Sequence, residues 1–193
     1  MKKVWWKSLL ILLPGEMKIS NDKEIVELQL RRKIRSQVDV RCRCNFDLPV
    51  VTLVPPNLDD GTPFPTTYWL TCPLLVNRVS SLEEKGMVKV FDEMVQIKGK
   101  LRALWEKRQE TYRKERVNLE KGSSNISPTG GVGGTIDHIK CLHAHLADHL
   151  ATGKNPIGES VDSLIGGYDC SVPCVEKEGS KLLTFNSKWK SKW

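Results

Sequence analysis

The sequence lacks an apolar run long enough to cross a membrane. Its most apolar stretch, Val4–Leu13, is interrupted by Lys7, whereas a transmembrane helix needs about 20 apolar residues. The stretch is not followed by the small-residue cleavage site that ends a secretory signal peptide. We therefore expect a cytoplasmic protein in which residues 1–21 form a poorly ordered extension, with Met17 as an alternative start.

Two common functional signatures are also absent. The chain has no GxxxxGK[ST] phosphate-binding loop and no C-x2-C pair of the kind found in zinc fingers. It has no large excess of one charge either, because 30 basic and 23 acidic residues give a net charge of +7. This mild basicity assists non-specific contact with nucleic acid or an anionic membrane, but it is not a recognition motif.

Cysteine is present in unusual number for a cytoplasmic chain. The six cysteines are Cys42, Cys44, Cys72, Cys141, Cys170 and Cys174. In a reducing compartment, clustered cysteines indicate metal binding or catalysis more often than disulfide bonds. The cysteines are therefore the starting point for a functional hypothesis.

The pattern of apolar and turn residues predicts an α+β fold, with a small, mostly antiparallel sheet of about three strands packed by several helices, one of them long. β-branched or alternating segments predict strands at 38–44, 49–54 and 67–71. Apolar residues at helical spacing predict helices at 22–35, 73–85, 87–98, 100–120, 136–151 and 160–164. Because charge of mixed sign covers much of the 100–120 helix, we expect most of it to face solvent.

The same pattern predicts one domain. We assign residues 22–174 to this domain and residues 175–193 to a frayed basic tail rich in lysine and tryptophan. The Gly/Ser-rich segment at 122–134 is typical of a flexible loop. No internal repeat and no second domain are indicated.

Several motifs, in order, resemble the bacterial family known as "domain of unknown function 501". They are RC-x-C with the following LPVV, then DGTPFPTTYWLTCP, GVGG, KCLH and NPIG, and the resemblance covers roughly residues 22–174. The matching positions are Cys42, Cys44, Cys72, Cys141, His143 and the segment Pro63–Thr66. Family members often have a glycine after RC-x-C, where this chain has Asn45. The resemblance implies a small cytoplasmic bacterial protein and implies no particular activity.

Two cysteines are predicted to lie where a helix affects their chemistry. Pro73 favours the first helical position, which places Cys72 at a helix N-terminus, where the positive end of the helix dipole lowers a thiol pKa. Cys141 lies inside the predicted 136–151 helix, on one face with His138, His145 and His149. Thiolate is both the metal-binding and the nucleophilic form of cysteine.

The first hypothesis is that three distant stretches converge on one metal site. The predicted ligands are Cys42, Cys44, Cys72 and Cys141, with His145 or His143 replacing one of the first two. Zinc is the first candidate ion, and an iron–sulfur cluster held by four thiolates is the second.

Two other classes of function stay open. In one, Cys72 or Cys141 is the nucleophile of an enzyme and His143 is its base or acid. In the other, the protein is a non-enzymatic module that contacts a protein, RNA or an acidic surface through its basic helix and through Trp189 and Trp193 among lysines.

Overall fold

The computed structural model describes residues 21–119, 129–166, 170–178 and 182–191. Within these residues, six α-helices surround a three-stranded antiparallel sheet, and a two-stranded sheet lies apart from it. The predicted fold class is confirmed. The predicted N-terminal extension and most of the Gly/Ser-rich loop lie outside the described residues.

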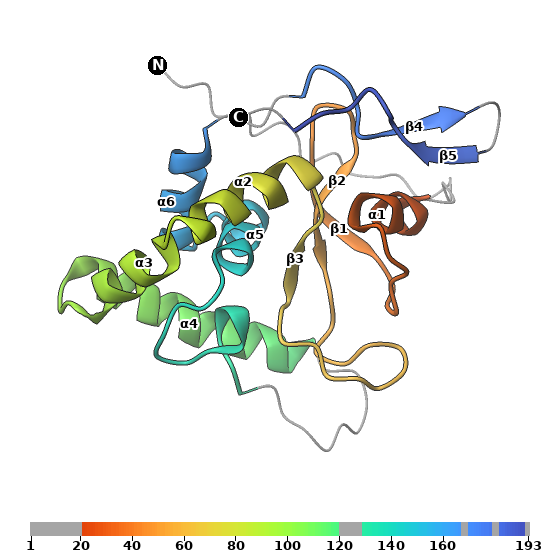
Figure 1. The fold of residues 1–193 in the computed structure, drawn as a ribbon. Coiled ribbons are helices and arrows are strands. Elements are labelled where there is room, and N and C mark those ends of the chain that lie inside the picture. Colours follow the sequence, from red (N-terminus) through yellow and green to blue (C-terminus); the bar gives the residue numbers. More distant parts are fainter. Residues whose placement is uncertain (1–20, 120–128, 167–169, 179–181, 192–193) are drawn as a thin grey trace, which may run out of the picture.

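The main sheet has the strand order β1-β2-β3, with β1 at Asp39–Arg43, β2 at Pro49–Leu53 and β3 at Tyr68–Leu70. These strands fall within the three predicted segments. Every residue of the central strand β2 is buried. Figure 1 shows the reason, because α2 and α5 lie on one side of the sheet and α1 lies on the other.

The helices follow the apolar periodicity of the sequence, with short connections between neighbours. They are α1 at Asp22–Leu30, α2 at Pro73–Glu84, α3 at Met87–Gln96, α4 at Lys100–Asn118, α5 at Leu142–Thr152 and α6 at Pro156–Ile165, with a 3-10 turn at Val132–Gly134. Gly86, at φ 79°, separates α2 from α3 in a backbone conformation that other residues rarely adopt. None of the described helices has the length and apolar character needed to cross a membrane.

Three predicted helix boundaries are wrong, and one of them is the start of α6, which lies at Pro156 rather than at residue 160 because the Asn155 side chain caps the helix there. The first helix ends at Leu30 rather than at residue 35, because Arg31 adopts the left-handed conformation and its N–H bonds back to the carbonyl of Leu28. The fifth helix begins at Leu142 rather than at residue 136. Asp92 of α3 accepts a hydrogen bond from the N–H of Ile139 and holds the preceding segment outside the helix.

The C-terminal residues also differ from the prediction. Instead of a frayed tail, strands β4 at Val175–Glu178 and β5 at Leu182–Phe185 pair in an antiparallel hairpin. Its side chains Cys174, Val175 and Leu183 are buried in a small cluster against α1. Burial of these apolar side chains orders the segment. In the sequence they stand among lysines, so the apolar pattern is hard to recognise.

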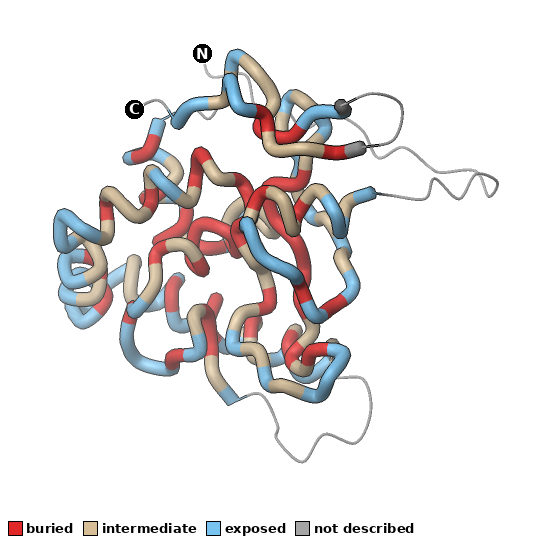
Figure 2. Tube along the Cα trace, turned by 45° about the vertical axis from the view of Figure 1, so that its right-hand side comes forward, coloured by how far each residue is buried: buried red, intermediate tan, exposed pale blue. Residues whose placement is uncertain are grey.

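The core lies between the sheet, α2, α5 and α6, and Figure 2 shows the buried residues gathered at the centre of the molecule. The long helix α4 is more deeply packed than its composition suggests. It buries Trp105 and Tyr112, and it also buries Arg108, Gln109 and Arg116. The prediction that its charged residues are solvated is therefore wrong for both arginines.

Candidate metal centre

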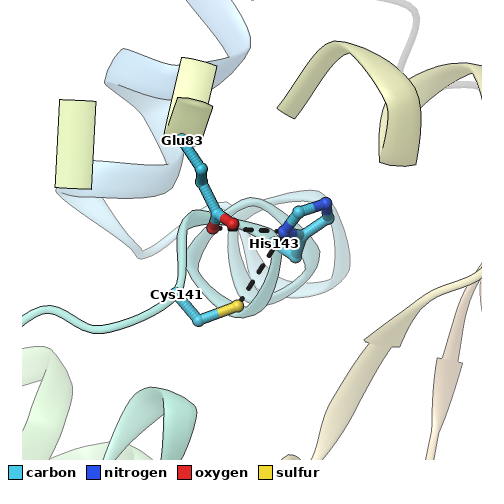
Figure 3. A group of neighbouring side chains, drawn as sticks. All are labelled: Glu83, Cys141 and His143. Carbon is cyan, nitrogen blue, oxygen red and sulfur yellow. Dashed lines mark hydrogen bonds and ion pairs between the residues drawn. The ribbon is translucent and has the colours of Figure 1, made fainter. Parts of the chain in front are cut away.

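The candidate site lies where the last turns of α2 meet the first residues of α5. On α2, Val76, Ser80 and Glu83 follow one another at helical spacing and share one face. Cys141 and His143 come from the start of α5, and Figure 3 shows the His143 ring between the Glu83 carboxylate and the Cys141 sulfur. Helix packing thus brings together residues that are far apart in the chain.

Three potential ligand atoms converge at this point. The His143 Nδ1 lies 3.1 Å from the Glu83 Oε1 and 3.9 Å from the Cys141 Sγ. All three ligand atoms lie within 4.8 Å of one another, and no other three His, Cys, Asp or Glu side chains in the described ranges do so. For zinc in a tetrahedral site, bond lengths imply about 3.4 Å between nitrogen and oxygen ligands and about 3.6 Å between sulfur and nitrogen ligands.

The hydrogen-bond partners of the His143 Nε2 determine the tautomer of the ring, and therefore whether Nδ1 has a lone pair available. The Nε2 lies 3.1 Å from the carbonyl oxygen of Val76 and 3.3 Å from the Ser80 Oγ. A carbonyl can only accept, so Nε2 carries a hydrogen and donates it. In the neutral ring, the lone pair of Nδ1 then points toward Glu83 and Cys141, and a backbone partner of this kind is usual for a metal-binding histidine.

The charges at this point favour a cation between the three atoms. Burial opposes protonation of His143, but its hydrogen bonds to Cys141 and Glu83 outweigh burial and raise its pKa to about 10. Burial likewise opposes the ionised form of Glu83, and the hydrogen bond from His143 outweighs it and lowers the pKa of the carboxyl group. A carboxylate and a nitrogen lone pair facing each other need a proton or a metal ion between them.

Glu83 has a structural role as well. Its Oε1 accepts a hydrogen bond of 2.6 Å from the N–H of Leu142, the first residue of α5. The N-cap residue Cys141 gives that helix end no side-chain hydrogen bond. Glu83 therefore caps α5 from a neighbouring helix, and the negative charge also suits the helix dipole.

Of the residues predicted from sequence, the structure brings Cys141 and His143 together. It adds Glu83, which the sequence reasoning missed. A signal was present, because Val76, Ser80 and Glu83 occupy the stripe next to the buried residues Leu75, Val79 and Leu82 on α2. The sequence does not show that the start of α5, with Cys141 and His143, packs against this stripe.

Cys72 lies at the N-cap of α2, as predicted, but its chemistry differs from the prediction. Burial raises its pKa to about 12, although the backbone N–H groups of Leu74 and Leu75 act in the opposite direction. The prediction of a lowered pKa is wrong, because desolvation outweighs the helix dipole here. Cys72 belongs to the main core cluster, and the nearby thiols of Cys174 and Cys170 raise its pKa further.

Cys42 and Cys44 lie two residues apart at the end of β1, and both pack against the main core cluster. Burial raises the pKa of Cys42 to about 11. Neither belongs to the group formed by Glu83, Cys141 and His143. That Cys42, Cys44 and Cys72 bind one ion together with Cys141 stays a prediction.

His145, the remaining predicted ligand, points into the packing between α5 and α6. Its Nδ1 lies 3.2 Å from the Oδ1 of Asn155, whose Nδ2 donates to Asp148. Asp148 in turn pairs with the buried Arg108 of α4. Complete burial lowers the pKa of His145 to about 4, so this network holds a neutral histidine. The predicted stripe that joined His145 to His138 and Cys141 is wrong, because both of the latter precede the helix.

The residues of the predicted interaction surface are partly engaged inside the protein. Arg108 and Arg116 of α4 are buried. Trp189 packs edge-on against Phe185, with the ring centroids 5.6 Å apart, whereas Trp193 lies outside the described residues. A contact with protein or nucleic acid through the rest of the basic helix and tail stays a prediction.

Comparison with known proteins gives one match. The family model described as "Protein of unknown function (DUF501)" matches residues 40–163, which include Glu83, Cys141 and His143. No curated protein and no solved structure matches the chain. The family match covers the main sheet apart from Asp39, and the helices from α2 to α6 apart from the last residues of α6.

Proposed function

We propose that this chain, which belongs to the DUF501 family of proteins of unknown function, binds one transition-metal ion through Glu83, Cys141 and His143. Zinc is the ion that best fits a mixed set of one thiolate, one imidazole and one carboxylate. An iron–sulfur cluster fits less well, because it is generally held by four thiolates and this group supplies one.

The observation that carries the proposal is the orientation of the His143 ring. Its Nε2 donates to the Val76 carbonyl, so a metal that displaces the proton held between His143 and Glu83 binds at Nδ1, beside the Glu83 carboxylate. The separations of 3.1 Å and 3.9 Å from Nδ1 differ from those of an ideal tetrahedral zinc site by about 0.3 Å. Small side-chain adjustments bring all three atoms to bonding distance.

The number of ligands indicates the kind of metal centre. Structural zinc sites have four protein ligands, whereas catalytic sites have three and leave one position for water or substrate. Cys141 and His143 also line an open pocket, so the fourth position faces a space that a small molecule can enter. We therefore assign the metal a role in binding or activating a ligand in this pocket.

A cysteine-nucleophile enzyme is the second candidate, and a specific observation favours it. Cys141 lies at the N-terminus of α5 with its Sγ 3.9 Å from the His143 Nδ1. If a proton rather than a metal lies between His143 and Glu83, the imidazolium lies beside the Cys141 sulfur, which is then placed to act as the nucleophile toward a substrate in the same pocket. The two candidates share their residues and differ in the cation.

Zinc titration of the metal-free, full-length protein tests the proposal. We expect one zinc ion per chain, and we expect Glu83→Gln, Cys141→Ser and His143→Gln each to weaken binding by more than about 100-fold, since the loss of even an outer-sphere partner costs 10–100-fold. Calorimetry gives the stoichiometry and the affinity together.

His138→Gln is the matched control. His138 also pairs with a carboxylate, 3.1 Å from Asp92, but it is exposed and lies outside the group. Its substitution should leave zinc binding unchanged. If the unsubstituted protein binds no zinc, and if iodoacetamide at neutral pH modifies Cys141 rapidly and selectively, the metal proposal is rejected in favour of the nucleophile.

A further inference from the structure

A pocket of about 390 Å³ opens beside the metal group. Its wall includes Arg32, Phe64, Tyr68, Trp69, Cys141 and His143. The volume is within the range of small-molecule sites, roughly 300–1,000 Å³. Because two of the three proposed metal ligands form part of this wall, a molecule in the pocket lies next to the metal.

Most of the pocket wall is apolar and aromatic. The Phe64 and Trp69 rings pack with centroids 5.3 Å apart, and Tyr68 packs edge-on against the buried Tyr112. Phe64, Tyr68 and Trp69 are themselves only half-buried. Tyr68 and Trp69 are neighbours on β3 and point to opposite faces of the sheet, so the ring beside Arg32 is Trp69. Trp69 together with Phe64 suits a ligand with a flat, apolar body.

The charge on this wall comes from Arg32. Its Cζ lies 4.6 Å from the centre of the Trp69 ring, and its side chain is exposed. No acidic residue lines the pocket in the described part of the chain. Three nearby basic residues are each held in an ion pair, namely Lys33 with Glu27, Arg35 with Asp60 and Arg43 with Asp22. Arg32 has no such pair among the described residues.

We infer that the pocket binds a small aromatic carboxylate, whose ring stacks on Trp69 and whose carboxylate pairs with Arg32. A guanidinium over an aromatic ring keeps its N–H groups available at its edge, and their fork geometry matches a carboxylate. Cys141 and His143 line the same pocket, so the proposed metal position adjoins the bound ligand. This last step depends on the proposed metal site, but the choice of ligand depends on Arg32 and the aromatic wall.

Binding of trans-cinnamate to the full-length, zinc-loaded protein tests the inference. Cinnamyl alcohol has the same body without the charge, and acetate has the charge without the body. We expect cinnamate to bind at least about tenfold more tightly than either, because charge-assisted pairing and stacking act together. Arg32→Gln should reduce cinnamate affinity to that of the alcohol.

Arg31→Gln is the control variant. Arg31 is the neighbouring arginine, and it also stands over an aromatic ring, with its Cζ 5.0 Å from the centre of Phe185, but it does not line this pocket. It should bind cinnamate as the unsubstituted protein does. Equal affinity for cinnamate and cinnamyl alcohol, or cinnamate binding that survives Arg32→Gln, would overturn the inference.

The same titrations separate the two proposals. If zinc binds but the affinity for cinnamate is unchanged in Arg32→Gln, the pocket assignment fails and the metal site stands. If zinc does not bind but Arg32 still governs cinnamate affinity, the metal site fails and the pocket assignment stands. Repeating the cinnamate titration on His143→Gln shows directly whether the metal contributes to ligand affinity.

Discussion

Two helices of this protein begin at a cysteine, and the two thiols have different surroundings. Cys72 starts α2 and is 8% exposed, packed in the main core. Cys141 starts α5 and lies on a pocket wall beside His143 and Glu83. Neither side chain caps its own helix by a hydrogen bond. A position at a helix N-terminus is therefore not enough to define a reactive or metal-binding cysteine.

The two thiols differ in whether neighbouring groups from other elements offset the cost of removing a charged form from water. The backbone N–H groups at the start of α2 lower the pKa of Cys72, but burial outweighs them and the value rises to about 12. At Cys141, a histidine and a carboxylate supply a place for a cation, and the group is only partly buried. The surroundings from other elements, rather than the helix end, decide which thiol has a function.

Alkylation rates should show the largest effect. In metal-free protein at pH 8, burial that raises the Cys72 pKa to about 12 leaves about 10³-fold less thiolate than an ordinary cysteine with a pKa near 8.5 has. Because a more basic thiolate is also more nucleophilic, its reaction with iodoacetamide should be slower by about 100-fold. Cys141 should react far faster. Peptide mapping by mass spectrometry measures both rates in one sample.

Zinc provides the internal control for this prediction. Added zinc should protect Cys141 and leave the slow rate of Cys72 unchanged. Equal rates for the two thiols in metal-free protein would contradict the contrast between them.

The second effect concerns stability. Free zinc at 100 times its dissociation constant should raise the free energy of unfolding by about 2.7 kcal/mol, because the folded state alone holds the site. We expect Cys72→Ala to keep this increment and Cys141→Ala to lose it. Urea denaturation with and without zinc measures the increment, and retention of the increment in Cys141→Ala would place the metal elsewhere.

The smallest effect is the direct cost of each substitution in metal-free protein. Cys72→Ala removes a buried sulfur from a packed core and should lower the free energy of unfolding by about 1 kcal/mol. Cys141→Ala removes a partly exposed one and should change it by less than about 0.5 kcal/mol. Denaturant midpoints give both values, and a larger loss at Cys141 than at Cys72 would reverse the assigned roles.

Local patterns in the sequence predicted much of this architecture. The β-branched run at 49–54 and the Cys72–Pro73 junction led to β2 and to the start of α2, because these signals act within a few residues. The boundary of α5 was missed, because a side chain from α3, Asp92, holds the residues before it. Tertiary contacts of this kind leave no local trace.

The site divides in the same way. Cys141 was predicted from its residue type and its helical spacing to His145, and His143 from the family resemblance, whereas Glu83 lies on a stripe of α2 whose packing partner the sequence does not show. Only the packing of α2 on α5 selects Glu83. His145 is only two residues from His143 but does not belong to the site. It is enclosed by α6 and lies in the hydrogen-bond network of Asn155 and Asp148.

X-ray absorption at the zinc edge tests the central claim most directly. On the zinc-loaded protein, the account predicts one sulfur at about 2.3 Å and nitrogen or oxygen ligands at about 2.0–2.2 Å. The sulfur contribution should disappear in Cys141→Ser and persist in Cys72→Ala. A shell of three or four sulfurs would instead place the metal among the other cysteines and contradict a site made by Glu83, Cys141 and His143.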